Sequence, residues 1–204
     1  MKLLDLTLPS PAENLACDEA LLDTCEDGVG DEILRFWEPR EHFVVVGYAN
    51  KVATEVNVAA CEARGVPVLR RCSGGGTVLQ GPGCLNYTLI LRITKDRPTH
   101  SISAANHFIM ERNRTAVEAA IPNLQAPVQV QGHTDLTIGG LKFSGNSQRR
   151  RRRFLLFHGT FLIEFNLALI SLLLPPPSKQ PDYRRDRSHE EFLTNITVPA
   201  AAPS

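Results

Sequence analysis

Three consecutive glycines, Gly74, Gly75 and Gly76, form the segment of this chain best suited to holding a ligand. Consecutive glycines let a backbone approach a bound group closely and turn its N–H groups toward an anion. Arg70 and Arg71 stand just before them and could neutralise a phosphate or carboxylate. The segment matches neither common glycine-rich nucleotide motif, and Gly-Gly-Gly also occurs in flexible hairpins. The residues alone therefore leave two interpretations, an anion-binding loop and a mobile turn.

A second segment, residues 135–146, alternates apolar and polar side chains around a Gly-Gly pair, which is typical of a tight hairpin. Pairing across this turn predicts Leu136 opposite Phe143 and Thr137 opposite Lys142. The polar face of the hairpin would then carry Asp135, Thr137, Lys142 and Ser144. A strand lysine is usually only solvated. The chain has only five lysines, however, so one inside a hairpin stands out.

Several strands and helices must position these two segments. The patterns predict strands at residues 2–8, 32–37, 43–47, 66–70 and 85–93 and across 128–165, the one at 85–93 buried on one face. They predict helices at residues 10–26, at 54–65 with Thr54 as its cap, at 103–120 and at 167–174, a further helix start at Ser188, and a frayed tail at 198–204. Because strands and helices do not alternate regularly, we expect an α+β fold.

Composition narrows the class of protein. Twenty-two basic and 22 acidic residues cancel, which argues against a general nucleic-acid binder. The N-terminus lacks an unbroken apolar stretch, and residues 154–174 are interrupted by polar side chains, so neither a signal peptide nor a membrane span is predicted. Five cysteines without a CxxC pair are typical of reduced thiols in a cytoplasmic protein.

The order of motifs resembles the biotin/lipoate protein ligase catalytic-domain family, on its lipoate branch. The resemblance rests on Arg-Arg-x-Ser-Gly-Gly-Gly-x-Val at residues 70–78, on Gly-x-Leu-Asn-Tyr at 83–87 and on Lys-x-Ser-Gly-Asn at 142–146. Asn-Leu-Ala-x-Asp-Glu-Ala at residues 14–20 and Phe-His-Gly-Thr at 157–160 extend it. It implies a mixed, largely antiparallel sheet flanked by helices, in one catalytic domain over residues 1–204. The core of that domain would span about residues 12–196, with no C-terminal accessory domain.

The resemblance also implies which residues act. Lys142 would contact the acyl carbonyl and phosphate of an acyl-adenylate and stabilise charge during transfer. The pocket for the adenylate would be lined by Arg70, Arg71, Ser73, Gly74, Gly75, Gly76, Thr77, Val78, Leu79, Asn86, Asp135 and Gly145. ATP with Mg²⁺ and lipoate would be the small-molecule substrates, and no protein metal site is expected. His158 is interpreted either as support for the site or as a structural histidine.

Three functions stay open at this point. The favoured one is a lipoate-protein ligase that forms lipoyl- or octanoyl-AMP and transfers the acyl group to a carrier lysine. The second is an octanoyltransferase that needs no ATP and uses a cysteine thioester, for which Cys72 and Cys84 are the nearest thiols. The third is a non-catalytic acyl or nucleotide binder. The expected partners are apo lipoyl domains of 2-oxoacid dehydrogenase complexes and the glycine-cleavage carrier protein. A separate accessory subunit is a further possible partner, whereas binding to nucleic acid or to a membrane is not expected.

Five consecutive arginines, at residues 149–153, are the densest charge in the chain. If they continue a strand, Arg149, Arg151 and Arg153 would face one side and Arg150 and Arg152 the other. One of these sets would then lie beside Lys142 and steer an acidic carrier domain. The plainer interpretation is a solvated strand edge.

Overall fold

Seven strands form the large sheet of the molecule, in the order β1-β2-β6-β10-β9-β8-β7. They are Lys2–Asp5 (β1), Ile33–Trp37 (β2), Cys84–Arg92 (β6), Val128–Gln131 (β7), Asp135–Ile138 (β8), Leu141–Arg150 (β9) and Phe154–Leu162 (β10). In this sheet β1 and β2 run parallel, and the other neighbours run antiparallel. This computed structural model describes residues 1–197. The tail predicted at 198–204 lies outside the described residues.

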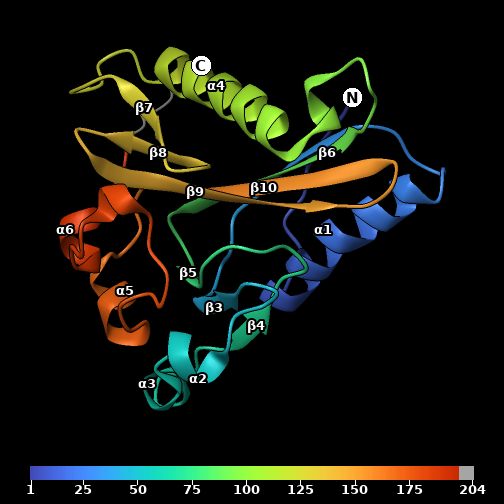
Figure 1. The fold of residues 1–204 in the computed structure, drawn as a ribbon. Coiled ribbons are helices and arrows are strands. Elements are labelled where there is room, and N and C mark those ends of the chain that lie inside the picture. The colour runs from blue at the N-terminus through green and yellow to red at the C-terminus, as the bar shows by residue number, and fades with distance from the viewer. Residues whose placement is uncertain (198–204) are drawn as a thin grey trace, which may run out of the picture.

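Two long helices cover opposite faces of this sheet (Figure 1). Helix α1, Pro11–Glu26, begins with the predicted capping box of Ser10 and Glu13. Helix α4, Ile102–Ala120, begins at Ser101, whose hydroxyl accepts from the N–H of Ala104. A short 3-10 turn, Pro98–His100, leads into it. The α+β class, with a mixed and largely antiparallel sheet flanked by helices, is confirmed.

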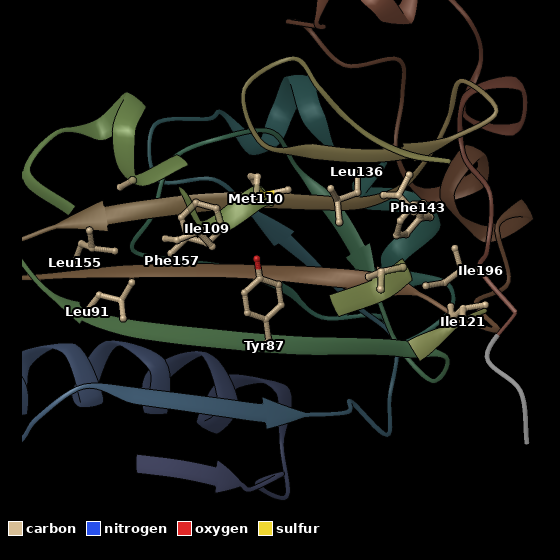
Figure 2. Packing of buried hydrophobic residues seen from close by; sticks show 13 residues of the cluster. Tyr87, Leu91, Ile109, Met110, Ile121, Leu136, Phe143, Leu155, Phe157 and Ile196 are labelled. Atoms are coloured by element: carbon tan, nitrogen blue, oxygen red, sulfur yellow. The ribbon is translucent and has the colours of Figure 1, made fainter. Parts of the chain in front are cut away.

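The main core lies between α4 and the sheet (Figure 2). Tyr87, Phe143 and Phe157 of the sheet pack there with Ile109 and Met110 of the helix. On the other face Leu22 of α1 packs on Ile90 of β6. Strand β6 is therefore buried on both faces, and the prediction of one-sided burial is wrong because α1 covers the second face.

A second sheet of three strands carries the glycine loop, in the order β4-β3-β5. Its strands are Phe43–Val46 (β3), Val68–Arg70 (β4) and Val78–Gln80 (β5). Two short helices, Val52–Glu55 (α2) and Val58–Glu62 (α3), replace the single helix predicted at residues 54–65. Thr54 lies inside α2, and Asn57 caps α3 by accepting from the N–H of Ala60.

The C-terminal part folds back onto the β8–β9 hairpin and the small sheet (Figure 1). Helix α5, Ala168–Leu173, packs against the small sheet, and the 3-10 turn Asp182–Arg184 follows. Helix α6, His189–Phe192, has the capping box predicted at Ser188. No helix in residues 1–197 is long and apolar enough to span a membrane.

Candidate active site

The glycine loop runs from β4 to β5, and the rest of the protein holds its carbonyl groups. The carbonyl of Gly74 accepts from Arg71 Nη2 at 2.6 Å and from Ser147 Oγ at 2.8 Å. The carbonyl of Gly76 accepts from Arg71 Nη2 at 2.7 Å, and that of Gly75 from Asn50 Nδ2 at 3.2 Å. The loop carbonyls are therefore held by side-chain donors, which favours an ordered anion-binding loop over a mobile turn.

The N–H groups of the same loop are left available. Among the hydrogen bonds of residues 1–197, none is donated by the N–H of Gly74, Gly75 or Gly76. A Cβ added at Gly74 or Gly76 would meet no protein atom within 4 Å, so space lies open beside both residues. Gly75 has a φ of +85°, which favours glycine. Fixed carbonyls, N–H groups without a partner and open space together form an edge of the loop, called the cradle below, that is suited to holding an anion.

The two arginines before the loop have structural partners that the sequence did not reveal. Arg70 donates to the carbonyls of Gly47, Tyr48 and Asn50 at 2.8–3.0 Å. Arg71 donates to the loop carbonyls and to Ser73 Oγ, and burial lowers its pKa to about 10, so it stays charged at neutral pH. Arg71 acts here as the clamp that shapes the cradle.

The lysine hairpin differs from the predicted pairing by a β-bulge. Thr137 pairs with Lys142 as predicted, but Leu136 pairs with Ser144 and not with Phe143. The bulge leaves Phe143 on the α4 side of the sheet, in the main core. Ser144 is buried and its hydroxyl accepts from Asn146 Nδ2, so it does not share the face of Lys142 as the pattern predicted.

Lys142 lies on the sheet face that meets the glycine loop. A Cβ on Gly145 would lie 2.9 Å from Lys142 Cε and Nζ, so the lysine side chain crosses Gly145. Ser147, two residues further on the same face, donates to the Gly74 carbonyl. Lys142 Nζ lies 2.9 Å from Asp135 Oδ1, and both side chains are largely covered. The two predicted segments therefore border one region.

A chain of four polar side chains runs beneath the loop; Ser73 and His158 were named from the sequence, whereas their link to Asp18 and Arg35 was not predicted. Ser73, fully buried, lies 2.5 Å from His158 Nε2 through its Oγ. His158 Nδ1 lies 3.5 Å from Asp18 Oδ2, and Asp18 Oδ1 accepts from Arg35 Nη1 at 2.6 Å. Asn14 Oδ1 also accepts from Arg35. The sequence did carry a signal for this chain of side chains. Asn14 and Asp18 are polar residues one turn apart on the predicted helix, so both point to the same side of it.

The remaining predicted pocket residues divide into open and packed positions. Asn86 is buried on β6, and its Nδ2 has no partner among residues 1–197. The Thr77 hydroxyl is likewise buried without a partner in that range. Val78 is partly exposed, whereas the Leu79 side chain packs in the core below the small sheet. Leu79 could therefore contact a ligand only through its backbone.

The cysteines near the loop are poorly suited to attack. Burial raises the pKa of Cys72 to about 11 and that of Cys84 to about 12. Both thiols are therefore protonated at neutral pH, and a thiolate is the nucleophilic form. Cys84 also packs in the core with Phe165.

The arginine run leaves the strand earlier than predicted, because β9 ends at Arg150. Arg149 faces the loop side, with its guanidinium 5.3 Å from the Tyr48 ring centre. Arg150 faces the α4 side and donates to the Thr99 carbonyl. Arg151 lies in the β9–β10 turn and pairs with Asp23 of α1 at 2.9 Å. Arg149 and Arg151 therefore point to the face that bears α1 and the glycine loop, Arg150 points to the face that bears α4, and of the first set only Arg149 lies on β9 itself.

Comparison with known proteins agrees with this geometry. A family model described as the lipoyl protein ligase A/B catalytic domain matches residues 10–200. A protein of Aeropyrum pernix named as a lipoate-protein ligase A is 31% identical over 177 residues, which cover 85% of this chain and 62% of that protein. The octanoyltransferase LipM of Brevibacillus brevis is 25% identical, and the match covers 95% of this chain and 77% of that enzyme.

Solved structures with the same fold include two lipoate protein ligases. One is from a bipartite ligase system of Thermoplasma acidophilum, with a TM-score of 0.77, 24% identity, and coverage of 98% of this chain and 76% of that one. Another is a lipoate-protein ligase A with bound ATP, with a TM-score of 0.71, 25% identity, and coverage of 95% and 75%. The chain spans 62% and 59% of two curated relatives named as ligases, from Aeropyrum pernix and Mycoplasma pneumoniae.

Proposed function

Because the chain belongs to the lipoyl protein ligase A/B catalytic-domain family, we propose that it is an ATP-dependent lipoate-protein ligase. Lipoate or octanoate would react with MgATP to give acyl-AMP and pyrophosphate. A carrier lysine would then attack the acyl carbon, forming an amide and releasing AMP and a proton. The family also contains octanoyltransferases, so the requirement for ATP is the specific part of this proposal.

The observation that carries the proposal is the free N–H edge of the glycine loop, on the sheet face that bears Lys142. The loop N–H groups would bind phosphate oxygens, because they have no partner among residues 1–197 and their carbonyls are fixed. Lys142 would bring its ammonium to the acyl phosphate and stabilise the charge that develops during transfer. Mg²⁺ would arrive with ATP.

The other proposed pocket residues would act through shape and orientation. Arg70, Arg71 and Ser73 would hold the loop, while Gly74, Gly75, Gly76, Thr77 and Val78 would border the nucleotide. Asn86 would offer its free amide, Leu79 its backbone, and Gly145 the space that Lys142 crosses. Asp135 would hold Lys142 before the adenylate forms.

The state of the thiols favours the ligase over the transferase. A transferase needs an activated thiolate, and burial keeps Cys72 and Cys84 protonated at neutral pH. Because some relatives are named octanoyltransferase, the experiment below also tests the transferase reaction. The carrier would be an apo lipoyl domain, because a structurally similar ligase was studied together with its E2 lipoyl domain. That similar ligase is bipartite, so a second subunit is also part of the proposal.

The test is mass spectrometry of an apo lipoyl domain incubated with the protein. One reaction contains MgATP with lipoate or octanoate, and the other contains acyl-carrier protein and no ATP. We expect the mass of one acyl group on the carrier in the first reaction only. Modification in the second reaction alone would replace the ligase with the transferase. A second subunit is tested by adding it if the first reaction forms acyl-AMP without transfer.

A further inference from the structure

The segment after α5 reaches the lysine hairpin at several points. The N–H of Thr194 donates to the Lys142 carbonyl at 2.9 Å, and Leu193 forms a parallel bridge with Lys142. Arg187 Nη1 lies 3.2 Å from the carbonyl of Gly140, at the tip of the hairpin. The backbone of β9 around Lys142 is therefore held by residues some 50 positions later in the chain.

One side chain of this segment touches the ion pair of Lys142 directly. Tyr183 Oη donates to Asp135 Oδ2 at 2.7 Å, while Asp135 Oδ1 accepts from Lys142 Nζ at 2.9 Å. The two oxygens of one carboxylate thus have different partners. Burial and the adjacent Asp135 raise the pKa of Tyr183, so its hydroxyl keeps its proton and remains a donor.

The Tyr183 ring is itself fixed. It lies 5.3 Å from the ring centre of Phe192, whose other neighbours include the guanidinium of Arg187. Arg187 Nη2 also donates to the carbonyl of Tyr183 at 3.1 Å. A hydroxyl held this firmly fixes the rotation of the Asp135 carboxylate and so the position of its Oδ1.

We propose that Tyr183 is a positioning residue for Lys142, acting through Asp135; this rests on the function proposed above. A donor to one carboxylate oxygen takes up part of the negative charge and weakens the attraction of the other oxygen for an ammonium group. Tyr183 would thereby keep the Lys142–Asp135 pair oriented yet loose enough for Lys142 to move to the acyl phosphate. Its loss should tighten that pair.

The first test reads Lys142 itself and does not depend on activity. The folded protein is labelled with limiting acetic anhydride at one pH, and the labelling of each lysine is measured by mass spectrometry with Lys95 as internal reference. In Tyr183→Phe we expect Lys142 to react roughly fivefold more slowly, less than the full effect of a hydrogen bond to a charged group because the pair is partly exposed. Asp135→Asn should accelerate Lys142 labelling, and the double variant should match Asp135→Asn.

A second test separates the hydroxyl from the anchoring of the segment. Asn195→Ala removes the two hydrogen bonds that anchor the segment to the backbone of Phe165 but touches neither Tyr183 nor Asp135, so its Lys142 labelling should stay close to the wild-type rate. In the ligase assay, Tyr183→Phe should lower kcat while the KM values for ATP and acyl acid stay within about twofold. Unchanged Lys142 labelling in Tyr183→Phe would overturn the proposal. A ligase assay that is negative for the wild type, with the labelling pattern as expected, would overturn only the ligase function.

Discussion

At the scale of single residues, Lys142 has the most direct test. We expect Lys142→Ala to reduce acyl transfer by roughly 100-fold or more, the usual cost of removing one charge-stabilising donor. The free energy of unfolding should fall by about 1–3 kcal/mol, because Lys142→Ala leaves the largely covered Asp135 carboxylate with only the Tyr183 hydroxyl as a partner. Lys95→Ala, on an exposed loop, serves as the matched control. Wild-type transfer rates in a folded Lys142→Ala protein would remove this residue from the mechanism.

The thiols supply a second prediction at the same scale. With pKa values raised to about 11 and about 12, Cys72 and Cys84 carry almost no thiolate at pH 7. Cys72→Ser and Cys84→Ala should therefore keep ATP-dependent activity within a few-fold, alanine being chosen at 84 because that site is apolar. Intact-mass spectrometry should detect no acyl adduct on the protein. A hydroxylamine-sensitive adduct on either cysteine would contradict the ligase proposal.

At the scale of elements, two glycines of the loop are expected to be needed for different reasons: Gly75 for its backbone conformation and Gly76 for the open space beside it. Gly76 lies outside the left-handed region and has open space where a Cβ would stand, so Gly76→Ala should fold normally. The new methyl group would occupy the cradle, and we expect the KM for ATP to rise roughly tenfold, an effect of about 1.4 kcal/mol. Gly75→Ala should instead lower the free energy of unfolding by about 1–2 kcal/mol, because φ is +85°. Equal KM values for ATP in wild type and Gly76→Ala would mean that the nucleotide does not bind against this loop.

The turn that precedes α6 makes a prediction about stability alone. Arg185 and Asp186 have φ of 53° and 56°, and the N–H of Arg187 donates to the Arg184 carbonyl. A left-handed conformation costs a non-glycine residue about 1–2 kcal/mol. Glycine avoids this cost, but part of the gain is offset because glycine loses more backbone entropy on folding. Arg185→Gly should therefore raise the free energy of unfolding by about 1 kcal/mol, seen as a rise in Tm of roughly 2–4 °C. Arg152→Gly, in a turn without positive φ, should not raise Tm.

Most elements could be predicted from local patterns, and the failures in the large sheet share one physical cause. Ser10, Gly139 and Ser188 fix a cap, a turn and a second cap through contacts within a few residues. The bulge at Phe143, the burial of Thr88 and the end of β9 at Arg150 depend on what packs against these strands from elsewhere. The candidate site divides in the same way between local and distant contacts. The glycine loop and Lys142 could be predicted because each lies in a recognisable local motif. The partner of Tyr183, by contrast, lies 48 positions away in the chain.

At the scale of the whole molecule, the site lies where distant parts of the chain meet. The loop of the small sheet contacts β9 through Ser147, and β10 through His158. His158 in turn faces Asp18 of α1, which pairs with Arg35 of β2. The buried polar chain thus connects a helix, two strands of the large sheet and the glycine loop. This arrangement makes the geometry of the cradle depend on the packing of α1 against the sheet.

The Arg35–Asp18 pair should therefore behave as one buried unit in a double-mutant cycle. Arg35→Met leaves the Asp18 carboxylate buried without its partner and should cost about 3–5 kcal/mol of unfolding free energy, as breaking a buried pair does. Asp18→Asn leaves the buried Arg35 guanidinium without its carboxylate partner and should also lower the free energy of unfolding. We expect the double variant to lose less than the sum of the two, with a coupling of about 1–3 kcal/mol in urea unfolding. The half-exposed pair of Arg114 and Glu118 within α4 is the control, with an expected coupling of about 0.5 kcal/mol or less. Additive costs at Arg35 and Asp18 would mean that the pair does not connect α1 to the sheet energetically, and that Arg71, Asn50 and Ser147 hold the loop independently of it.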